Sequence, residues 1–271
     1  MKKYNIYDVS IFKPTYKKEI SFYISQNGYR FDLLIVFGGD GTLNEAINGL
    51  MISKTKPKLL YIPSGTVNDV GNYLKISSNY KKALKLLNEK TVLIDVCAIN
   101  EMYFLYVFAC GKFTNISYGG NEAFSKRKLG KFYYYIKAIK EFFRTSKIDF
   151  NINDNGYIKC SLLLGLNIGR VGGFRIRRSP NKLNDGEIKV VSFRSTTFFT
   201  VIAIGLYLLL GMSIKGICKE YTGSNFKIRS NQKNLFNADG EESYTTEEVN
   251  VKVLKEAIEI FVPKRSIKLY F

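Results

Sequence analysis

Two glycine-containing turns carry the residues of this chain with the clearest chemical potential. The segment GGDGT covers residues 38–42, and the segment PSGTVND covers residues 63–69. Each follows a short apolar run that is typical of a buried strand. A glycine turn lets the backbone approach a ligand closely, and the start of the next helix offers N–H groups. Both turns could therefore hold a phosphate.

Acidic residues distinguish these turns from a simple anion site. Asp40 and Asp69 lie within the turns, and Asp95 lies near the end of a later apolar run. A carboxylate beside a phosphate is unfavourable unless it binds a metal ion, a ribose hydroxyl or a proton in transit. Ordinary alternatives remain open: a tight Gly-Asp-Gly turn, a helix N-cap at Asn68–Asp69 and a loop acid at Asp95.

The segments around the turns predict a parallel sheet in the first third of the chain. Apolar runs over 31–37, 58–63 and 91–100 alternate with helix-like segments over 42–51 and 80–89. This alternation indicates βαβ units. Turns at the carboxyl ends of neighbouring parallel strands converge on one crevice, which favours a ligand shared by the two glycine turns.

The pattern changes near residue 94. Asn155–Gly156 and Asp185–Gly186 are turn signals between later strand-like runs, which occur over 102–111, 149–156, 159–169, 187–193, 225–230 and 249–254. They predict an antiparallel β-sandwich or barrel, interrupted by helices over 128–143 and 196–212. We therefore expect an α/β domain over 1–93, rejoined by the tail 257–271, and an all-β sandwich domain over 94–256. The active site is expected in the cleft between them.

Composition narrows the chemistry. The chain has 271 residues, of which 46% are hydrophobic, so a sizeable folded core is expected. It has no histidine, so a general base must be a carboxylate, Lys, Tyr or Cys. The four cysteines are far apart and lack zinc-site spacing, which indicates buried thiols in a reducing cytoplasm.

The charge balance favours anionic partners. The chain has 41 Lys and Arg against 23 Asp and Glu, for a net charge of +18. Basic clusters lie at 125–131 and 170–178; they could face an anionic membrane or simply be solvated surface. No nucleic-acid-binding motif accompanies the charge, so no nucleic-acid partner is expected. The apolar stretch 196–212 is shorter than the ~20 residues that span a bilayer, which favours a buried or interface-lying helix.

The order of the motifs points to a known family. GGDGTLNE, PSGTVND, LIDV, LNDGE and NADGEE follow one another, and the chain from Phe31 onward resembles diacylglycerol and sphingosine kinase catalytic domains, especially soluble bacterial lipid kinases. The resemblance implies transfer of the ATP γ-phosphate to diacylglycerol or a similar lipid alcohol, with Mg²⁺. GGDGT alone is shared with NAD kinases. A kinase of soluble metabolites and a catalytically weakened lipid-binding homologue therefore remain alternatives.

The resemblance also assigns roles to residues. Glu241 is the first choice of catalytic base and Asp239 the second, although a hairpin turn alone would explain Asp239–Gly240. Asp40 would serve magnesium in the ATP site. The nucleotide would lie against Gly38, Gly39, Asp40, Gly41, Thr42, Leu43, Asn44, Glu45, Gly65, Thr66, Asn68, Asp69 and Asp95. A structural magnesium would use Asp185, with backbone carbonyls near Lys182 and Glu187.

The expected partner is a lipid substrate at an anionic membrane surface, reached by a cytoplasmic, peripherally associated protein; a homodimer is compatible with this. Family members usually carry an N-terminal strand and an Asn-Pro-x-Ser-Gly loop before GGDGT, and this sequence has neither. Residues 6–12 resemble the family's second strand, and Phe12 and Lys13 stand where a Thr is common. A truncated product, a misassigned start or a weakened enzyme would explain this. Weaker ATP binding and an exposed sheet edge are expected.

Overall fold

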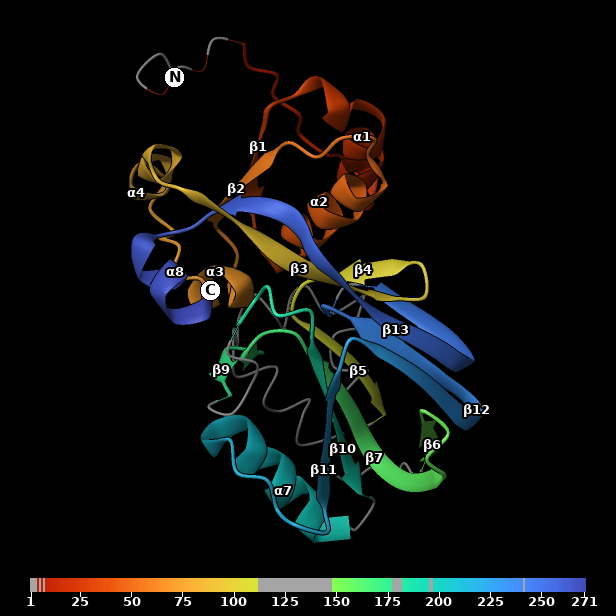
Figure 1. Cartoon of the computed structure of the whole chain (residues 1–271). Helices are drawn as coiled ribbons and strands as arrows, with labels where there is room; N and C mark the ends of the chain where they lie inside the picture. The colour runs from red at the N-terminus through yellow and green to blue at the C-terminus, as the bar shows by residue number, and fades with distance from the viewer. Residues whose placement is uncertain are drawn as a thin grey trace.

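The computed structural model describes residues 4, 6, 8–111, 148–176, 182–194, 197–240 and 242–271. Most of its strands belong to one large sheet, shown in Figure 1. The elements in chain order are α1 (Glu19–Asn27), η2 (Gly28–Arg30), β1 (Leu33–Gly38), α2 (Asp40–Ile52), β2 (Lys58–Pro63), α3 (Asp69–Tyr73), α4 (Tyr80–Leu84), η3 (Lys85–Asn88), β3 (Thr91–Ile99), β4 (Met102–Phe104), β5 (Val107–Gly111), β6 (Ile148–Ile152), β7 (Tyr157–Leu166), β8 (Arg170–Val171), β9 (Phe174–Arg175), β10 (Ile188–Arg194), α7 (Thr197–Leu210), β11 (Cys218–Gly223), β12 (Asn225–Ala238), β13 (Glu242–Phe261) and α8 (Lys264–Tyr270).

The large sheet is mixed. Its main path runs β1-β2-β13-β12-β5-β7-β10-β11, with β3 attached at β13, β4 attached at β3, and β6 attached at β12 and β7. β1 and β2 are parallel, joined by the crossover helix α2. The hairpins of the later region are antiparallel. The described chain is thus a mixed α/β, strand-rich fold. Because continuous pairing joins the parallel and antiparallel parts, the division into two domains at residue 94 stays a prediction.

The predicted third strand lies in a different place from the one expected. β3 pairs antiparallel with β13, from Val251↔Ile99 to Phe261↔Thr91, and with β4. The end of β13 instead lies beside β2, where Ile260 pairs in parallel with Leu59. Figure 1 shows β3 and β13 extending together between the two parts of the molecule. The apolar run correctly predicted a strand at β3, but such a run does not identify the neighbouring strand, and the predicted βαβ pairing of β3 was wrong.

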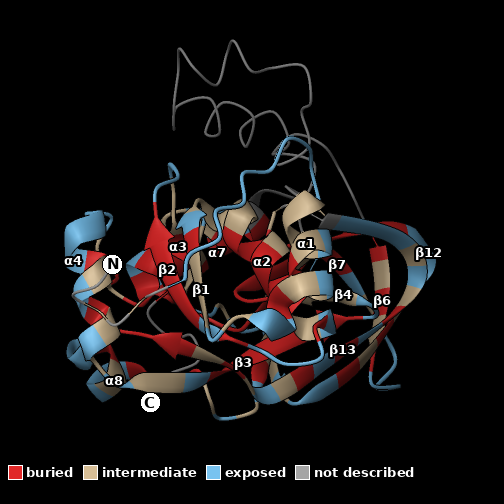
Figure 2. Ribbon diagram, turned by 90° about the horizontal axis from the view of Figure 1, so that it is seen from above, coloured by how far each residue is buried: buried red, intermediate tan, exposed pale blue. Residues whose placement is uncertain are grey.

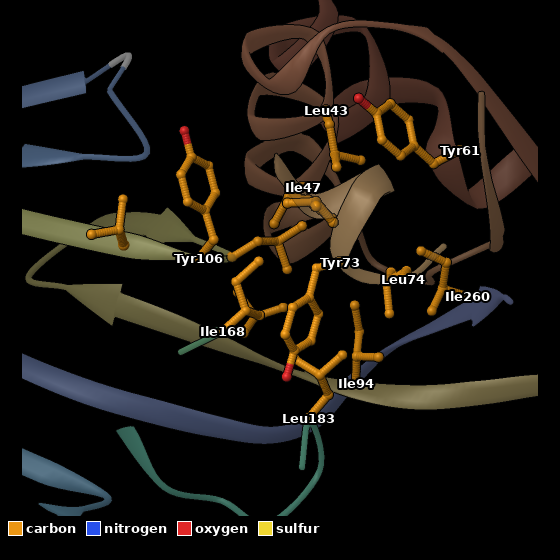
Figure 3. Packing of buried hydrophobic residues seen from close by; sticks show 14 of the residues in the cluster. Leu43, Ile47, Tyr61, Tyr73, Leu74, Ile94, Tyr106, Ile168, Leu183 and Ile260 are labelled. Carbon is orange, nitrogen blue, oxygen red and sulfur yellow. The ribbon is translucent and has the colours of Figure 1, made fainter. Parts of the chain in front are cut away.

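Two clusters of buried side chains stabilise this arrangement. One lies around α2 and β2, where Leu43, Ile47 and Tyr61 pack near Ile260 (Figure 3). The other fills the antiparallel part with large side chains, among them Phe108 and Phe236. Figure 2 shows buried residues along the strands and α2, with exposed residues mainly toward the rim. Burial of each large side chain contributes about 1.5–3 kcal/mol, so both clusters stabilise the fold, and the first holds in place α2 and β2, which flank the glycine turns.

The structure confirms some of the local predictions and contradicts others. The segment 80–89 is helical, but it divides into α4 and the 3-10 turn η3. The helix predicted over 196–212 is confirmed as α7, which covers Thr197–Leu210, and the Asn155–Gly156 turn joins β6 to β7. Residues 6 and 8–12 form no strand, so that prediction was wrong; Phe12 stacks on Tyr23 instead. The helix predicted over 128–143 lies outside the described residues.

The cysteine prediction holds for three positions. Cys97, Cys110 and Cys160 are buried free thiols, whereas Cys218 is only partly buried. All four thiols are free, as the spacing indicated. Cys218 is less buried because it begins β11, the last strand on the main path of the sheet.

Candidate functional site

The two glycine turns meet backbone to backbone. Ser64 N donates to Gly38 O at 2.8 Å. A Cβ placed on Gly65 would lie 2.6 Å from Gly39 Cα, and a Cβ on Gly39 would lie 3.2 Å from Gly65 Cα. A side chain at Gly65 would force the turns apart, and one at Gly39 would make a tight contact. Residues 64–66 are exposed, so the second turn is open to a ligand.

Asn68 shapes the second turn. Gly65 N donates to Asn68 Oδ1 at 2.9 Å, and Asn68 Nδ2 donates to Gly65 O at 2.7 Å. Its φ of 52° lies in the left-handed region, which Asn tolerates better than most side chains. This double bridge closes the loop of residues 65–68 and fixes the point at which α3 begins.

Asp40 connects the two turns. It is the first residue of α2, and it accepts hydrogen bonds from Asp69 N at 3.0 Å and Val70 N at 3.4 Å. Burial raises the pKa of the Asp40 carboxyl, and the nearby charge of Asp69 raises it further, whereas the backbone N–H donors lower it. The structure therefore brings Gly39, Gly65, Asp40 and Asp69 into one cluster.

Arg170 and Gly173 complete the surroundings of Asp69. Arg170 Nε donates to Asp69 Oδ1 at 3.0 Å, and Gly173 N donates to the same oxygen at 2.9 Å. The Asp69 side chain is only 2% exposed. Burial raises the pKa of the Asp69 carboxyl, while the Gly173 N–H and the charge of Arg170 lower it.

Asp239 belongs to a second cluster. Its carboxylate accepts hydrogen bonds from the backbone N–H groups of Leu105, Tyr106 and Val107, and from Asn44 Nδ2. Complete burial raises the pKa of Asp239 to about 6, against the opposing effect of these donors. Because four donors already bind the Asp239 carboxylate, it is better suited to anchoring its turn than to accepting a proton. Glu241, the first choice of base, lies outside the described residues.

Asn48 extends this cluster along α2. Asn48 Nδ2 donates to Tyr103 O at 2.9 Å, and Tyr103 N donates to Asn48 Oδ1 at 3.0 Å. Asn44 and Asn48 are four residues apart, so both face the same side of the helix. The helix that begins at the first glycine turn is thus hydrogen-bonded to β4 and to the turn that precedes Glu241.

Asp95 forms a third cluster. It accepts hydrogen bonds from Gly186 N and Glu256 N, each at 2.7 Å. Asp185 is exposed and accepts from Glu187 N at 3.1 Å. The hydrogen bonds of Asp95 therefore lead to the Asp185 loop, and no bond between Asp95 and Asp40 or Asp69 occurs among the described residues.

The remaining predicted ligand residues vary in exposure. Gly41, Thr42 and Glu45 are half-buried, Thr66 is exposed, and Leu43 is a core residue with 1% exposure. Glu45 accepts from Lys18 N at 3.0 Å. Lys182 and Glu187 are exposed. Burial of Leu43 means that its contribution to any nucleotide site is through packing of α2 (Figure 3).

The acidic pair has the donor chemistry of a magnesium site. Mg²⁺ prefers hard carboxylate oxygens, and it usually keeps several waters while using one or two carboxylates and a substrate phosphate. Asp40 and Asp69 supply two such carboxylates next to the exposed turn. Three clustered His, Cys, Asp or Glu residues that could hold a metal do not occur in the described part of the chain. The pair therefore fits a hydrated ion more readily than an all-protein cage.

Sequence reasoning missed the roles of Arg170, Gly173 and Asn48. Arg170 was assigned to a basic surface cluster, although it forms a largely buried ion pair with Asp69. The Gly172–Gly173 pair was a signal for a two-residue hairpin turn, and the four-residue spacing of Asn44 and Asn48 was a signal for a shared helix face. Neither signal identifies the residue contacted.

Comparison with known proteins defines the class. The family model for the diacylglycerol kinase catalytic domain matches residues 2–99. A crystal structure of a candidate diacylglycerol kinase from Bacillus anthracis superimposes with a TM-score of 0.76 at 25% identity, covering 93% of this chain and 85% of that one. The mixed α/β fold is thus one found among kinases.

Curated relatives narrow the class to a family. The diacylglycerol kinase of Staphylococcus carnosus is 32% identical over 242 residues, which are 86% of this chain and 78% of that protein. The diacylglycerol kinase of Staphylococcus epidermidis strain RP62A is 33% identical over 241 residues, covering 86% of this chain and 75% of that protein. This chain belongs to the diacylglycerol kinase family.

Proposed function

We propose that this chain transfers the γ-phosphate of ATP to the hydroxyl of diacylglycerol or a similar lipid alcohol, with Mg²⁺ as cofactor. The observation that carries the proposal is the meeting of the two glycine turns around Asp40 and Asp69. The Asp69 N–H lies 3.0 Å from Asp40 Oδ2, and the two turns approach so closely that a Cβ on Gly65 would clash with the Gly39 backbone. Family membership supports a kinase, and the named relatives favour a lipid acceptor over NAD.

Phosphoryl transfer depends mainly on neutralising charge and on aligning donor and acceptor. Residues 64–66 form an exposed turn against which phosphate oxygens could lie, with the hydroxyl of Thr66 on the same turn. Asp40 and Asp69 would hold Mg²⁺ through its waters, and the bound ion would neutralise phosphate charge. The protein supplies the fixed separation of the two turns, which is set by the contact of Gly39 with Gly65.

Glu241 is proposed as the base that takes the proton of the lipid hydroxyl. It directly follows Asp239–Gly240 in the sequence. The Asp239 carboxylate is hydrogen-bonded to residues 105–107 and to Asn44, so it anchors the turn from which Glu241 emerges. A carboxylate base is consistent with a chain that has no histidine.

A lipid acceptor requires contact with a membrane surface. The net charge of +18 favours anionic lipid. The helix α7 presents Phe199, Ile202 and Leu209, which are 67%, 41% and 55% exposed, whereas its Tyr207 is buried against Phe193. In the part of the chain that the structure describes, no helix is both long and apolar enough to cross a membrane. We propose that α7 contacts the lipid interface from outside.

The direct test compares acceptors. Purified protein is incubated with labelled ATP and Mg²⁺, with either diacylglycerol in mixed micelles or NAD as acceptor. We expect label in the lipid and none in NAD. Label only in NAD would overturn the lipid assignment, and label in neither would favour a lipid-binding homologue without catalysis.

A substitution tests the proposed base. Glu241→Gln should reduce lipid phosphorylation by a factor of about 10² to 10⁴, because a positioned base contributes on that order. Binding of ATP, measured by calorimetry, should remain unchanged. The exposed Glu247→Gln serves as a control that removes the same charge on β13. Full turnover by Glu241→Gln would remove Glu241 from this role.

A further inference from the structure

A two-residue hairpin brings Arg170 to the acidic pair. β8 and β9 are antiparallel, and Arg170 lies opposite Arg175. The connecting Gly172 and Gly173 have φ values of 59° and 87°. Positive φ at both central residues is the requirement of a type I′ hairpin turn, and glycine meets it without strain. A Cβ on Gly173 would have Val67 Cγ1 as its nearest neighbour, at 4.0 Å, so the hairpin tip faces the second glycine turn.

The hairpin delivers one charge and one N–H to the same carboxylate oxygen. Arg170 Nε and Gly173 N lie 3.0 and 2.9 Å from Asp69 Oδ1. The side chains of Arg170 and Asp69 are 22% and 2% exposed. A carboxylate this deeply buried needs a partner to stay charged. The charge of Arg170 is therefore paired with Asp69, so Arg170 does not act as a solvated member of the basic cluster over 170–178.

The charge of Arg170 acts on two carboxylates. The Asp69 backbone N–H donates to Asp40, so hydrogen bonds that pass through Asp69 link the β8–β9 hairpin to the start of α2. Two carboxylates in one place repel each other. Arg170 offsets this repulsion, and a divalent cation bound at the same place would offset it as well.

We propose that Arg170 is the internal counter-charge of the Asp40–Asp69 pair. The inference rests on the proposed function, which assigns a divalent cation to this pair. The guanidinium charge opposes a dication that arrives alone. Because phosphate adds negative charge, the pair takes up a cation far more readily together with a nucleotide than without one. Arg170 thereby makes cation binding depend on the nucleotide.

The test measures binding of Mn²⁺ to the whole chain without nucleotide, by electron paramagnetic resonance. Arg170→Gln should bind Mn²⁺ about three- to tenfold more tightly than wild type, since a like charge some ångströms from a dication costs on the order of 1 kcal/mol at high dielectric. The control Arg175→Gln removes the same charge from the opposite strand of the hairpin. It should bind Mn²⁺ within about twofold of wild type, because an exposed charge is screened.

The sign of the effect separates this role from a purely structural one. If Arg170 only supported the structure, its loss should loosen the site and weaken Mn²⁺ binding. Equal or weaker binding by Arg170→Gln, or no Mn²⁺ binding by wild type, would therefore overturn the proposal.

Arg170→Lys keeps the test decisive if the Gln variant does not fold. Lysine retains the charge but loses the guanidinium geometry. Wild-type Mn²⁺ affinity in Arg170→Lys would support the counter-charge, and a changed affinity would contradict it. If wild type showed no lipid phosphorylation but the predicted Mn²⁺ pattern, the kinase proposal would fall while the role of Arg170 stood.

Discussion

At the scale of single residues, Asp239 shows burial and hydrogen bonding acting against each other. Four N–H donors favour the charged carboxylate, but complete burial raises its pKa to about 6. The folded pKa is above the unfolded value of 3.8. The folded state therefore holds a proton in a range where the unfolded state does not. Protonation of Asp239 therefore contributes to the stability of the folded state; the contribution is fully present below the unfolded pKa and is lost as pH rises through about 6.

Asp239→Asn should remove this pH dependence. From the two pKa values, wild type should lose about 1 kcal/mol of unfolding free energy at this residue between pH 5 and pH 7. Urea unfolding of wild type and Asp239→Asn at both pH values measures the difference. Asp40, Asp69 and Asp95 also have raised pKa values, but they titrate in both proteins and cancel in the comparison. The same pH dependence in both proteins would contradict the account.

Residue types in the glycine turns could be predicted from the sequence, but their partners could not. The spacing of Gly39, Asp40 and Gly65 indicated close backbone approach and a site for charge, and the structure places them together. Arg170 lies 101 positions from Asp69 in the chain. A single sequence has no local signal for such a contact, because an arginine in a basic cluster looks the same whether it is solvated or buried against a carboxylate.

At the scale of elements, the contact of the two glycine turns sets the geometry of the site. Gly65→Ala would place a Cβ 2.6 Å from Gly39 Cα. Because Gly39 Cα belongs to the backbone, the clash can be relieved only if the ends of β1 and β2 move apart. We expect a destabilisation of about 1–3 kcal/mol, as for other overpacked positions, with weaker nucleotide binding. Thermal unfolding and ATP calorimetry would measure both effects.

Gly205→Ala is the matched control for that substitution. Gly205 lies within α7, and a Cβ there would meet no atom within 4 Å. Alanine should leave the protein as stable or up to about 1 kcal/mol more stable, because glycine is a poor helix former. If Gly65→Ala behaved like Gly205→Ala, the turns would not be held in contact.

Prediction of the elements themselves succeeded where a pattern was local and failed where pairing was remote. α7 and the β1–α2–β2 unit follow from apolar runs and helical spacing, and the structure has them. The placement of β3 failed because its neighbour β13 ends 162 positions after the last residue of β3 (261 − 99). The same remote pairing brings Ile260 to Leu59. A strand's burial can be predicted from its residues, whereas its partner depends on the rest of the chain.

At the scale of the whole molecule, charge and exposed apolar surface should act together at a membrane. Ile202 and Leu209 are seven residues apart on α7, so they share a face. Replacing both with Ser should weaken binding to vesicles that contain anionic lipid on the order of tenfold, from the apolar area lost. Sedimentation with vesicles measures this. Leu269→Ser, at a 49% exposed position in α8, should have little effect; equal loss from both changes would exclude a specific role for α7.

The central claim is that the paired glycine turns and Asp40–Asp69 bind the phosphates of ATP together with Mg²⁺. Calorimetric titration of wild type, Asp69→Asn and Gly65→Ala with ATP in the presence of Mg²⁺ tests it most directly. We predict saturable ATP binding by wild type in the micromolar-to-millimolar range usual for enzyme substrates. The ATP affinity of Asp69→Asn should be weaker by at least about tenfold, because an interaction with the ion is lost. Absence of saturable binding by wild type at millimolar ATP, or unchanged affinity in Asp69→Asn, would contradict the claim.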